Sequence, residues 1–283
     1  MKQIHPDVWS YLQDILEWEK IVKSISSYFS FFLCVFSAQV IASSAQMTSE
    51  NAPTFYAQSG QDRVQIIELF SSEGCHSCPP ADKWLSQYTH DPDLWQKYVP
   101  LAFHVDYWDY IGWKDRFAKQ RFSQRQYQYE RRGATGQVYT PQFVVNGKEW
   151  RGWFRHRIDK SVTLPKVKDT PGQLTFKVKE QTIFAEFNKP KSESNYVVLH
   201  VALLASDIRS HITRGENKRK TLEHDFVVLN HKSYRALDND LTFEGSAPDI
   251  PNIAKEAGKL AWAAWIEENG VPVQATGGWI NSL

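Results

Sequence analysis

Short apolar runs alternate with amphipathic segments through the first half of the chain. Residues 64–70 and 101–105 are rich in β-branched and aromatic side chains, and they predict buried strands. Residues 81–88 and 115–132 predict helices, each of which ends at proline or glycine turn residues. The first half therefore begins with strand, helix, strand and helix.

A hairpin follows these elements. Residues 143–145 and 148–151 flank Asn146-Gly147, and Asn-Gly is the strongest two-residue signal for a hairpin turn. Residues 155–162 predict a last short helix. A strand–helix–strand unit implies a parallel pair with a right-handed crossover, to which the hairpin adds antiparallel strands. This order is the thioredoxin arrangement, so we expect an α/β thioredoxin-like domain over residues 60–163.

The hydrophobic period changes to two after residues 164–172, a stretch with prolines, charges and a glycine that is typical of a linker. Turn signals, among them Asn269-Gly270, separate short alternating segments. We therefore expect an all-β antiparallel, sandwich-like domain over residues 172–283. Its predicted strands are residues 174–178, 182–187, 196–205, 226–229, 260–267 and 271–276.

Two cysteines, Cys75 and Cys78, stand where the first predicted strand turns into the first predicted helix. The N-terminus of a helix stabilises a thiolate, which is the attacking species in thiol–disulfide exchange. We expect Cys75 to be the exposed nucleophile, Cys78 the buried resolving thiol, and protonated His76 a further stabiliser of the thiolate. The alternatives are a structural disulfide, or half of a zinc site that would need four ligands, and for His76 a solvated loop side chain.

Thr140-Pro141 precedes the predicted hairpin. Proline cannot donate to a sheet ladder, so its position suggests the edge or start of a strand. In the thioredoxin fold a cis-proline at this place faces the cysteine pair, and the residue before it can hydrogen-bond an extended substrate. We therefore expect a cis bond before Pro141 and substrate contacts at Thr140, against the alternative of an ordinary trans proline.

Long motifs in both halves carry a family resemblance. They are IELFSSEGCHSCPPAD (67–82), AFHVDYWD (102–109), GWKD (112–115), VYTPQFVVNG (138–147), GEN (215–217) and LEH (222–224). With these motifs the chain resembles the bacterial secreted thioredoxin-like family catalogued as domain-of-unknown-function family 1223. The resemblance implies a thioredoxin-like fold in an exported protein, and it implies no particular reaction. Glu216, Asn217 and His224, within these motifs, are assigned no chemistry.

Two more residues are candidates near the cysteine pair. Glu68 lies close to where thioredoxins keep a buried acid that accepts a proton from the resolving cysteine; the alternative is a structural, hydrogen-bonded glutamate, because a one-residue slip turns a strand residue to the other face. His104 is a candidate for substrate contact. With the cysteine pair, His76, Asp106 and Asp109, it is also a candidate ligand of Cu(I). The alternative is a buried, satisfied strand residue.

The composition narrows the class of partner. The 283-residue chain is 42% hydrophobic, enough for a sizeable core, and its formal net charge is +1. A charge so close to zero gives no reason to expect nucleic acid or an anionic surface as partner. We therefore expect thiol- or disulfide-bearing proteins, or a redox partner, and no membrane contact beyond a targeting segment.

An apolar run over residues 25–42 precedes both expected domains. Two lysines stand before it, small residues follow it, and it is short for a membrane span of about 20 apolar residues. We interpret residues 1–45 as a signal or targeting segment for export, periplasmic in a Gram-negative organism. Cleavage would remove Cys34 and leave one cysteine pair, as suits a disulfide that cycles in an oxidising compartment. The alternative is an uncleaved anchor.

The leading interpretation is an exported thiol–disulfide oxidoreductase that needs no cofactor. One alternative is a periplasmic copper-binding or chaperone module that uses the cysteine pair and His104. Another is a non-catalytic thioredoxin-like binding protein whose disulfide only stiffens a loop. The expected catalytic residues are Cys75, Cys78, Pro141 and Glu68, and the expected substrate contacts are Thr140, His76 and His104.

Overall fold

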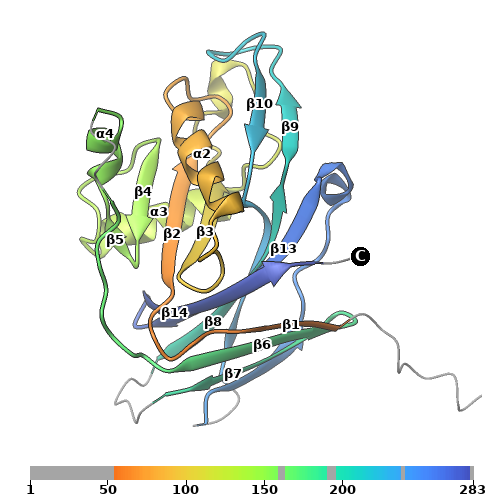
Figure 1. The fold of residues 1–283 in the computed structure, drawn as a ribbon. Helices are drawn as coiled ribbons and strands as arrows, with labels where there is room; N and C mark the ends of the chain where they lie inside the picture. Colours follow the sequence, from red (N-terminus) through yellow and green to blue (C-terminus); the bar gives the residue numbers. More distant parts are fainter. Residues whose placement is uncertain (1–53, 159–162, 190–195, 237–239, 281–283) are drawn as a thin grey trace, which may run out of the picture. The chain divides into compact units, whose positions relative to one another are not determined.

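Strands from both halves of the chain form one eight-stranded sheet (Figure 1). The structure is a computed structural model that describes residues 54–158, 163–189, 196–236 and 240–280. The strands lie across the sheet in the order β14 (Val271–Trp279), β13 (Lys259–Glu268), β8 (Val197–Ser206), β11 (Val227–Arg235), β3 (Tyr98–His104), β2 (Gln65–Ser71), β4 (Gln142–Val145) and β5 (Lys148–Glu149).

The expectation of an α/β thioredoxin-like domain followed by an antiparallel sandwich-like domain is wrong. The molecule is mostly β-sheet with few helices, and strands from both halves share one sheet. The strand β11 connects the strands of the two halves, because it pairs in parallel with β3 and antiparallel with β8. A buried parallel strand such as β3 needs neighbours on both sides, and here a strand more than 120 positions further along the chain supplies one.

The elements of the first half nevertheless follow the predicted order. The helices are α2 (Pro79–Ser86), α3 (Gln120–Arg131) and α4 (Gly152–His156), with β2 and β3 paired in parallel. Proline at the first positions of α2 suits a helix start, because the missing N–H would have no partner there. The predicted hairpin is confirmed: Asn146 and Gly147 both have positive φ, as this tight turn between β4 and β5 requires.

A second, four-stranded antiparallel sheet contains a strand that the sequence did not predict. Its order is β1 (Thr54–Gln58), β6 (Gln173–Lys179), β7 (Thr182–Asn188) and β12 (Thr242–Ser246). The first predicted strand is residues 64–70, yet β1 precedes it and pairs with β6 along its whole length. A third sheet is the two-stranded hairpin of β9 (Ile208–His211) and β10 (Thr221–His224).

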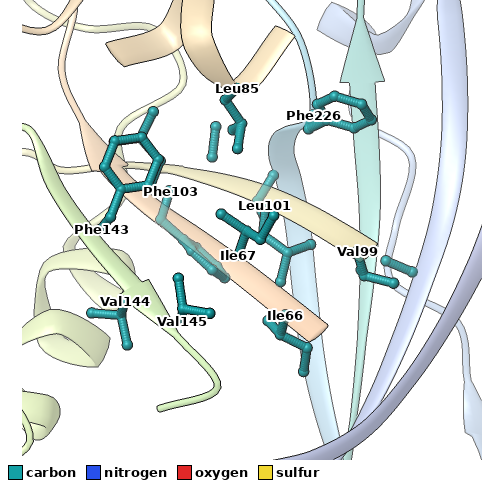
Figure 2. Packing of buried hydrophobic residues seen from close by; sticks show 14 of the residues in the cluster. Ile66, Ile67, Leu85, Val99, Leu101, Phe103, Phe143, Val144, Val145 and Phe226 are labelled. Carbon is teal, nitrogen blue, oxygen red and sulfur yellow. The ribbon is translucent and has the colours of Figure 1, made fainter. Parts of the chain in front are cut away.

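The strands β8 and β13 bury both of their faces, which is why they read as nearly continuous apolar runs. Alternate residues point to opposite faces of a strand. In β13, Trp262 and Ala264 pack with the core that the four-stranded sheet lines, whereas Ala263 and Trp265 pack with the core around β2, β3 and α2. Figure 2 shows part of the core around β2, β3 and α2, with Ile67, Leu85, Leu101, Phe103 and Phe226.

The predicted targeting segment lies outside the described residues, and Cys34 with it. Contacts group Pro53–Leu283 into one compact unit. Among the described helices, none is both long enough and apolar enough to cross a membrane.

Candidate functional site

Cys75 and Cys78 form a disulfide at the start of α2, with 5.5 Å between their Cα atoms. Cys78 is the residue that caps α2, and its carbonyl oxygen accepts hydrogen bonds from the backbone N–H groups of Ala81 and Asp82. Between the cysteines, His76 and Ser77 are exposed. The hydroxyl oxygen of Ser77 lies 3.4 Å from Cys75 Sγ, so this sulfur lies against the exposed dipeptide.

The expectation that Cys75 is an exposed nucleophile is wrong for the oxidised protein. Cys75 is 1% exposed and Cys78 is 0% exposed. The hairpin of β9 and β10 lies with β10 beside α2 (Figure 1), and its turn is hydrogen-bonded to the cysteine loop. Asn217 Nδ2 donates to the carbonyl oxygens of Glu73 and Cys75, at 2.9 Å each, and the backbone N–H of His76 donates to Glu216 Oε2 at 3.0 Å.

A tryptophan links the cysteine loop to the predicted proline. Trp108 Nε1 donates to Thr140 Oγ1 at 2.7 Å, and Trp108 Cβ lies 3.2 Å from the place that a side chain on Gly74 would occupy. The bond between Thr140 and Pro141 is cis, as predicted. Thr140 is half-buried and its hydroxyl is already engaged by Trp108, so its role in substrate binding stays a prediction.

Five ionisable side chains are buried beside the cysteine loop: Glu73, Asp82, His104, Asp115 and His224. The ring of His224 lies between two carboxylates, with Nε2 3.5 Å from Glu73 Oε1 and Nδ1 3.9 Å from Asp82 Oδ2. These distances permit ion pairing, yet neither ring nitrogen has a hydrogen bond among the described residues, and neither has Glu73 Oε1. We refer to the five residues as the buried acid–base cluster.

The electrostatics of the cluster follow from burial and from these neighbours. Burial raises the pKa of Asp82 above its usual value, although His224, His104 and the Ser71 hydroxyl act in the opposite direction. For His104, burial opposes protonation, but Asp115 outweighs it at 2.7 Å and raises the pKa of His104 to about 9. For Asp115 burial likewise opposes the charge, and His104 wins and lowers its pKa. His104 and Asp115 are therefore a buried ion pair.

Glu68 belongs to a different network. Arg125 Nε donates to Glu68 Oε2 at 2.6 Å, and Arg125 also donates to Glu267 at 2.7 Å. The hydroxyl of Tyr129 donates to Glu68 as well. With its carboxylate engaged by these donors, Glu68 fits the structural alternative better than the predicted proton relay.

His104 does not assemble a metal site with the cysteines. Its Nδ1 is bound to Asp115, and its ring packs against Phe117 and His224. In the part of the chain that the structure describes, no group of three or more His, Cys, Asp or Glu side chains is arranged to hold a metal ion. The copper alternative therefore has no ligand set to support it.

The residues that sequence reasoning missed come from the second half or from the motifs themselves. Asn217 and His224 were noticed and assigned no chemistry, and Glu73, Asp82 and Asp115 were not singled out. The sequence feature that could have identified them is that they are polar residues within otherwise apolar motifs. The spacing gave no indication that 215–224 closes over 73–82, because that contact joins segments about 140 residues apart.

Comparison with solved structures gives two similar chains. The crystal structure of a structural-genomics target from Agrobacterium tumefaciens is 24% identical, with a TM-score of 0.50, and covers 78% of this chain and 96% of that chain. This likeness shows a shared fold and no more. HBP35 of Porphyromonas gingivalis is 14% identical, with a TM-score of 0.49, and covers 78% of this chain and 76% of that chain, which is too weak to argue from.

Among curated proteins, none matches the sequence. A family match does exist, and it covers both the cysteine loop and the turn that closes over it. It extends over residues 66–266 and is described as a protein of unknown function, DUF1223. Because the match spans more than half of the 283 residues, the chain belongs to the DUF1223 family.

Proposed function

We propose that the protein is a thiol–disulfide oxidoreductase whose Cys75–Cys78 disulfide exchanges with the thiols of partner proteins. The observation that carries the proposal is the position of this disulfide, at the N-terminal end of α2 with the exposed dipeptide His76-Ser77 between its cysteines. The N-terminal end of a helix stabilises the thiolate that thiol–disulfide exchange produces.

A purely structural role is the competing function, and the loop length argues against it. A disulfide stabilises a protein mainly by closing a loop in the unfolded chain. With two residues between the cysteines, that contribution is about 2 kcal/mol, against about 3 kcal/mol for a loop of 15 residues. The neighbouring cluster of buried ionisable groups is also more than a structural disulfide needs.

The exchange proceeds in two steps. A thiolate of a protein dithiol attacks Cys75 Sγ, a mixed disulfide forms, the Cys75–Cys78 bond breaks, and the electron pair stays on Cys78 Sγ. The second thiolate of the partner then attacks the mixed disulfide, forms the partner's disulfide, and releases Cys75 as a thiolate. Two electrons pass from the partner to the protein, and the reverse sequence oxidises the protein again.

Access to Cys75 needs movement of the turn that carries Glu216 and Asn217, because the sulfur is buried in the closed state. Three hydrogen bonds hold this turn to the cysteine loop. Each contributes roughly 1 kcal/mol, so that a transient opening is energetically accessible.

Export of the protein is part of the same proposal. A disulfide persists in an oxidising compartment and is rare in the cytosol. The apolar run over residues 25–42 supports this location as a sequence feature.

A redox titration tests the proposal. A Cys34→Ala variant, which keeps only Cys75 and Cys78, is equilibrated in thiol buffers of defined potential, and free thiols are counted by alkylation while circular dichroism reports folding. We expect half-reduction of the folded protein above about −300 mV, the range below which structural disulfides of secreted proteins lie. We also expect disulfide transfer to a reduced dithiol peptide, and none from Cys75→Ala. A disulfide that is reduced only after unfolding in urea would reject the proposal.

A further inference from the structure

The buried acid–base cluster contains polar atoms that have no hydrogen-bond partner among the described residues. Buried polar groups are almost always hydrogen-bonded, and each exception needs a reason. Here both nitrogens of His224 and Glu73 Oε1 have no hydrogen-bond partner among the described residues, although all three are buried. Leaving such groups unpaired lowers the stability of the folded protein, so a function that needs them is the better explanation.

The geometry of α2 connects this cluster to Cys78. Asp82 follows Cys78 by four residues, and its backbone N–H donates to the Cys78 carbonyl oxygen at 3.1 Å. Residues four apart on a helix lie one above the other on the same face. The Asp82 carboxylate is held there by the Ser71 hydroxyl, which donates at 2.8 Å. Its second oxygen, Oδ2, points to His224 Nδ1.

We propose that Asp82 is the proton donor and acceptor of the Cys78 thiol, and that His224 passes the proton between Asp82 and Glu73. This inference rests on the proposed function. When the disulfide breaks, the electron pair remains on Cys78 Sγ and the Asp82 carboxyl gives its proton to that sulfur. His224 then donates from Nδ1 to the Asp82 carboxylate and takes a proton at Nε2 from the Glu73 carboxyl. Oxidation reverses each transfer.

The electrostatics of the site agree with this direction of transfer. Burial keeps the pKa of Asp82 above that of an ordinary aspartate, so its carboxyl holds a proton at higher pH than usual. The other ionisable groups that face it are the protonated His104, the Asp115 carboxylate, His224 and, beyond His224, Glu73. His104 and Asp115 neutralise each other at 2.7 Å, so they bias Asp82 without competing for the proton.

The first experiment measures how fast dithiothreitol reduces the oxidised Cys34→Ala protein between pH 5.5 and 8.5. Rates are compared at equal concentration of the attacking thiolate, so that the remaining pH dependence belongs to the protein. We expect Asp82→Asn to lower the rate about 100-fold at pH 6, near the lower end of general acid catalysis, and to flatten its pH profile. His224→Gln should lower the rate less. Asp93→Asn, an exposed aspartate on the surface, is the matched control and should keep the parental rate and profile.

A second measurement needs no variant to fold. Infrared difference spectra between the oxidised and reduced protein, with 13C-labelled glutamate carboxyl groups, should show that one buried carboxyl, that of Glu73, loses its proton on reduction, because the proton that leaves Asp82 is replaced from Glu73 through His224. If Asp82→Asn folds and keeps the parental rate and pH profile, or if no carboxyl signal changes, the proton path is rejected while the oxidoreductase stands. If the folded parent is not reduced by dithiothreitol at all, both proposals fall together.

Discussion

At the scale of the residue, the buried ion pair of His104 and Asp115 is the feature with the clearest consequence for stability. His104 and Asp115 are fully buried and 2.7 Å apart, and each stabilises the charged form of the other. A buried charge is tolerated only when it is paired and hydrogen-bonded. The Asp115 carboxylate meets this condition with three partners, because the backbone N–H groups of Glu73 and Phe117 donate to it in addition to His104.

This ion pair predicts a loss of stability at alkaline pH. The pKa of His104 rises from about 6.5 in the unfolded chain to about 9 in the folded protein. The stabilisation is therefore complete below pH 6.5 and is lost as the pH rises to 9. At 1.36 kcal/mol per pKa unit it amounts to roughly 3 kcal/mol. Urea denaturation at pH 6.5 and pH 9.5 should show a fall of this order in the free energy of unfolding.

Asp115→Asn is the control for the pH effect. Without the carboxylate, burial opposes protonation of His104 and only the weaker effects of Asp82 and Glu73 raise its pKa, so the variant should be less stable at pH 6.5 and should lose less than the parent by pH 9.5. The pKa of His231 is lowered, chiefly by burial, and this acts below pH 6.5, outside the chosen window. If the parent and the variant lost the same free energy of unfolding between pH 6.5 and pH 9.5, the pH effect could not be assigned to the His104–Asp115 pair.

At the scale of the element, the hairpin of β9 and β10 is hydrogen-bonded through its turn to the cysteine loop. Its turn is held by Asn217, a fully buried side chain that donates to the carbonyl oxygens of Glu73 and Cys75. Gly215 at the same turn has a φ of +73°, a conformation that glycine adopts without strain. Lys220 Nζ donates to Asn217 Oδ1, so that the amide is fixed in one orientation.

Asn217→Ala should expose the disulfide. The variant loses two hydrogen bonds to the cysteine loop, worth together about 2 kcal/mol, which corresponds to a roughly 30-fold larger open population. Reduction of the folded protein by dithiothreitol should accelerate by that factor. Lys218→Ala, at an exposed position of the same turn, is the matched control and should react like the parent. If Asn217→Ala is reduced no faster than this control, the turn does not govern access.

At the scale of the whole molecule, one buried arginine links the two halves of the eight-stranded sheet. Arg125, on α3, donates to Glu68 on β2 and to Glu267 on β13. Its ring neighbours are Phe103, Tyr129 and Trp265, over which the guanidinium lies at 5.3–5.5 Å. Together with the pairing of β11 and β3, these contacts join strands of both halves, and we therefore expect the sheet to unfold as one cooperative unit.

Arg125→Leu should therefore weaken both halves at once. Removing the arginine leaves Glu68 and Glu267 buried without their charge partner, a change that typically costs 3–5 kcal/mol. Hydrogen exchange should show an equal loss of protection in β2 and in β8, which are separated by β3 and β11. Arg131→Leu, at an exposed position of α3, is the control and should change stability little. A loss confined to β2 would mean that the halves unfold independently.

The sequence by itself determined the local elements and the position of the cysteine loop. Apolar periodicity indicated β2, β3, β8 and β13, Asn146-Gly147 indicated a hairpin, and the cysteine spacing indicated a disulfide where a strand meets a helix. These features depend on residues close together in the chain, whose preferences act in any context. The helical order of the first half was also local, and it suggested a separate domain that does not exist.

Only the tertiary structure decided which strands share a sheet and what covers the disulfide. Three contacts join segments far apart in sequence: the pairing of β11 with β3, the hydrogen bond from Asn217 to the Cys75 carbonyl oxygen, and the placement of His224 between Glu73 and Asp82. Such contacts depend on how the whole chain closes, and a strand with two apolar faces carries no label for its neighbour. For that reason the local pattern located the sulfurs correctly, while their surroundings followed from the fold.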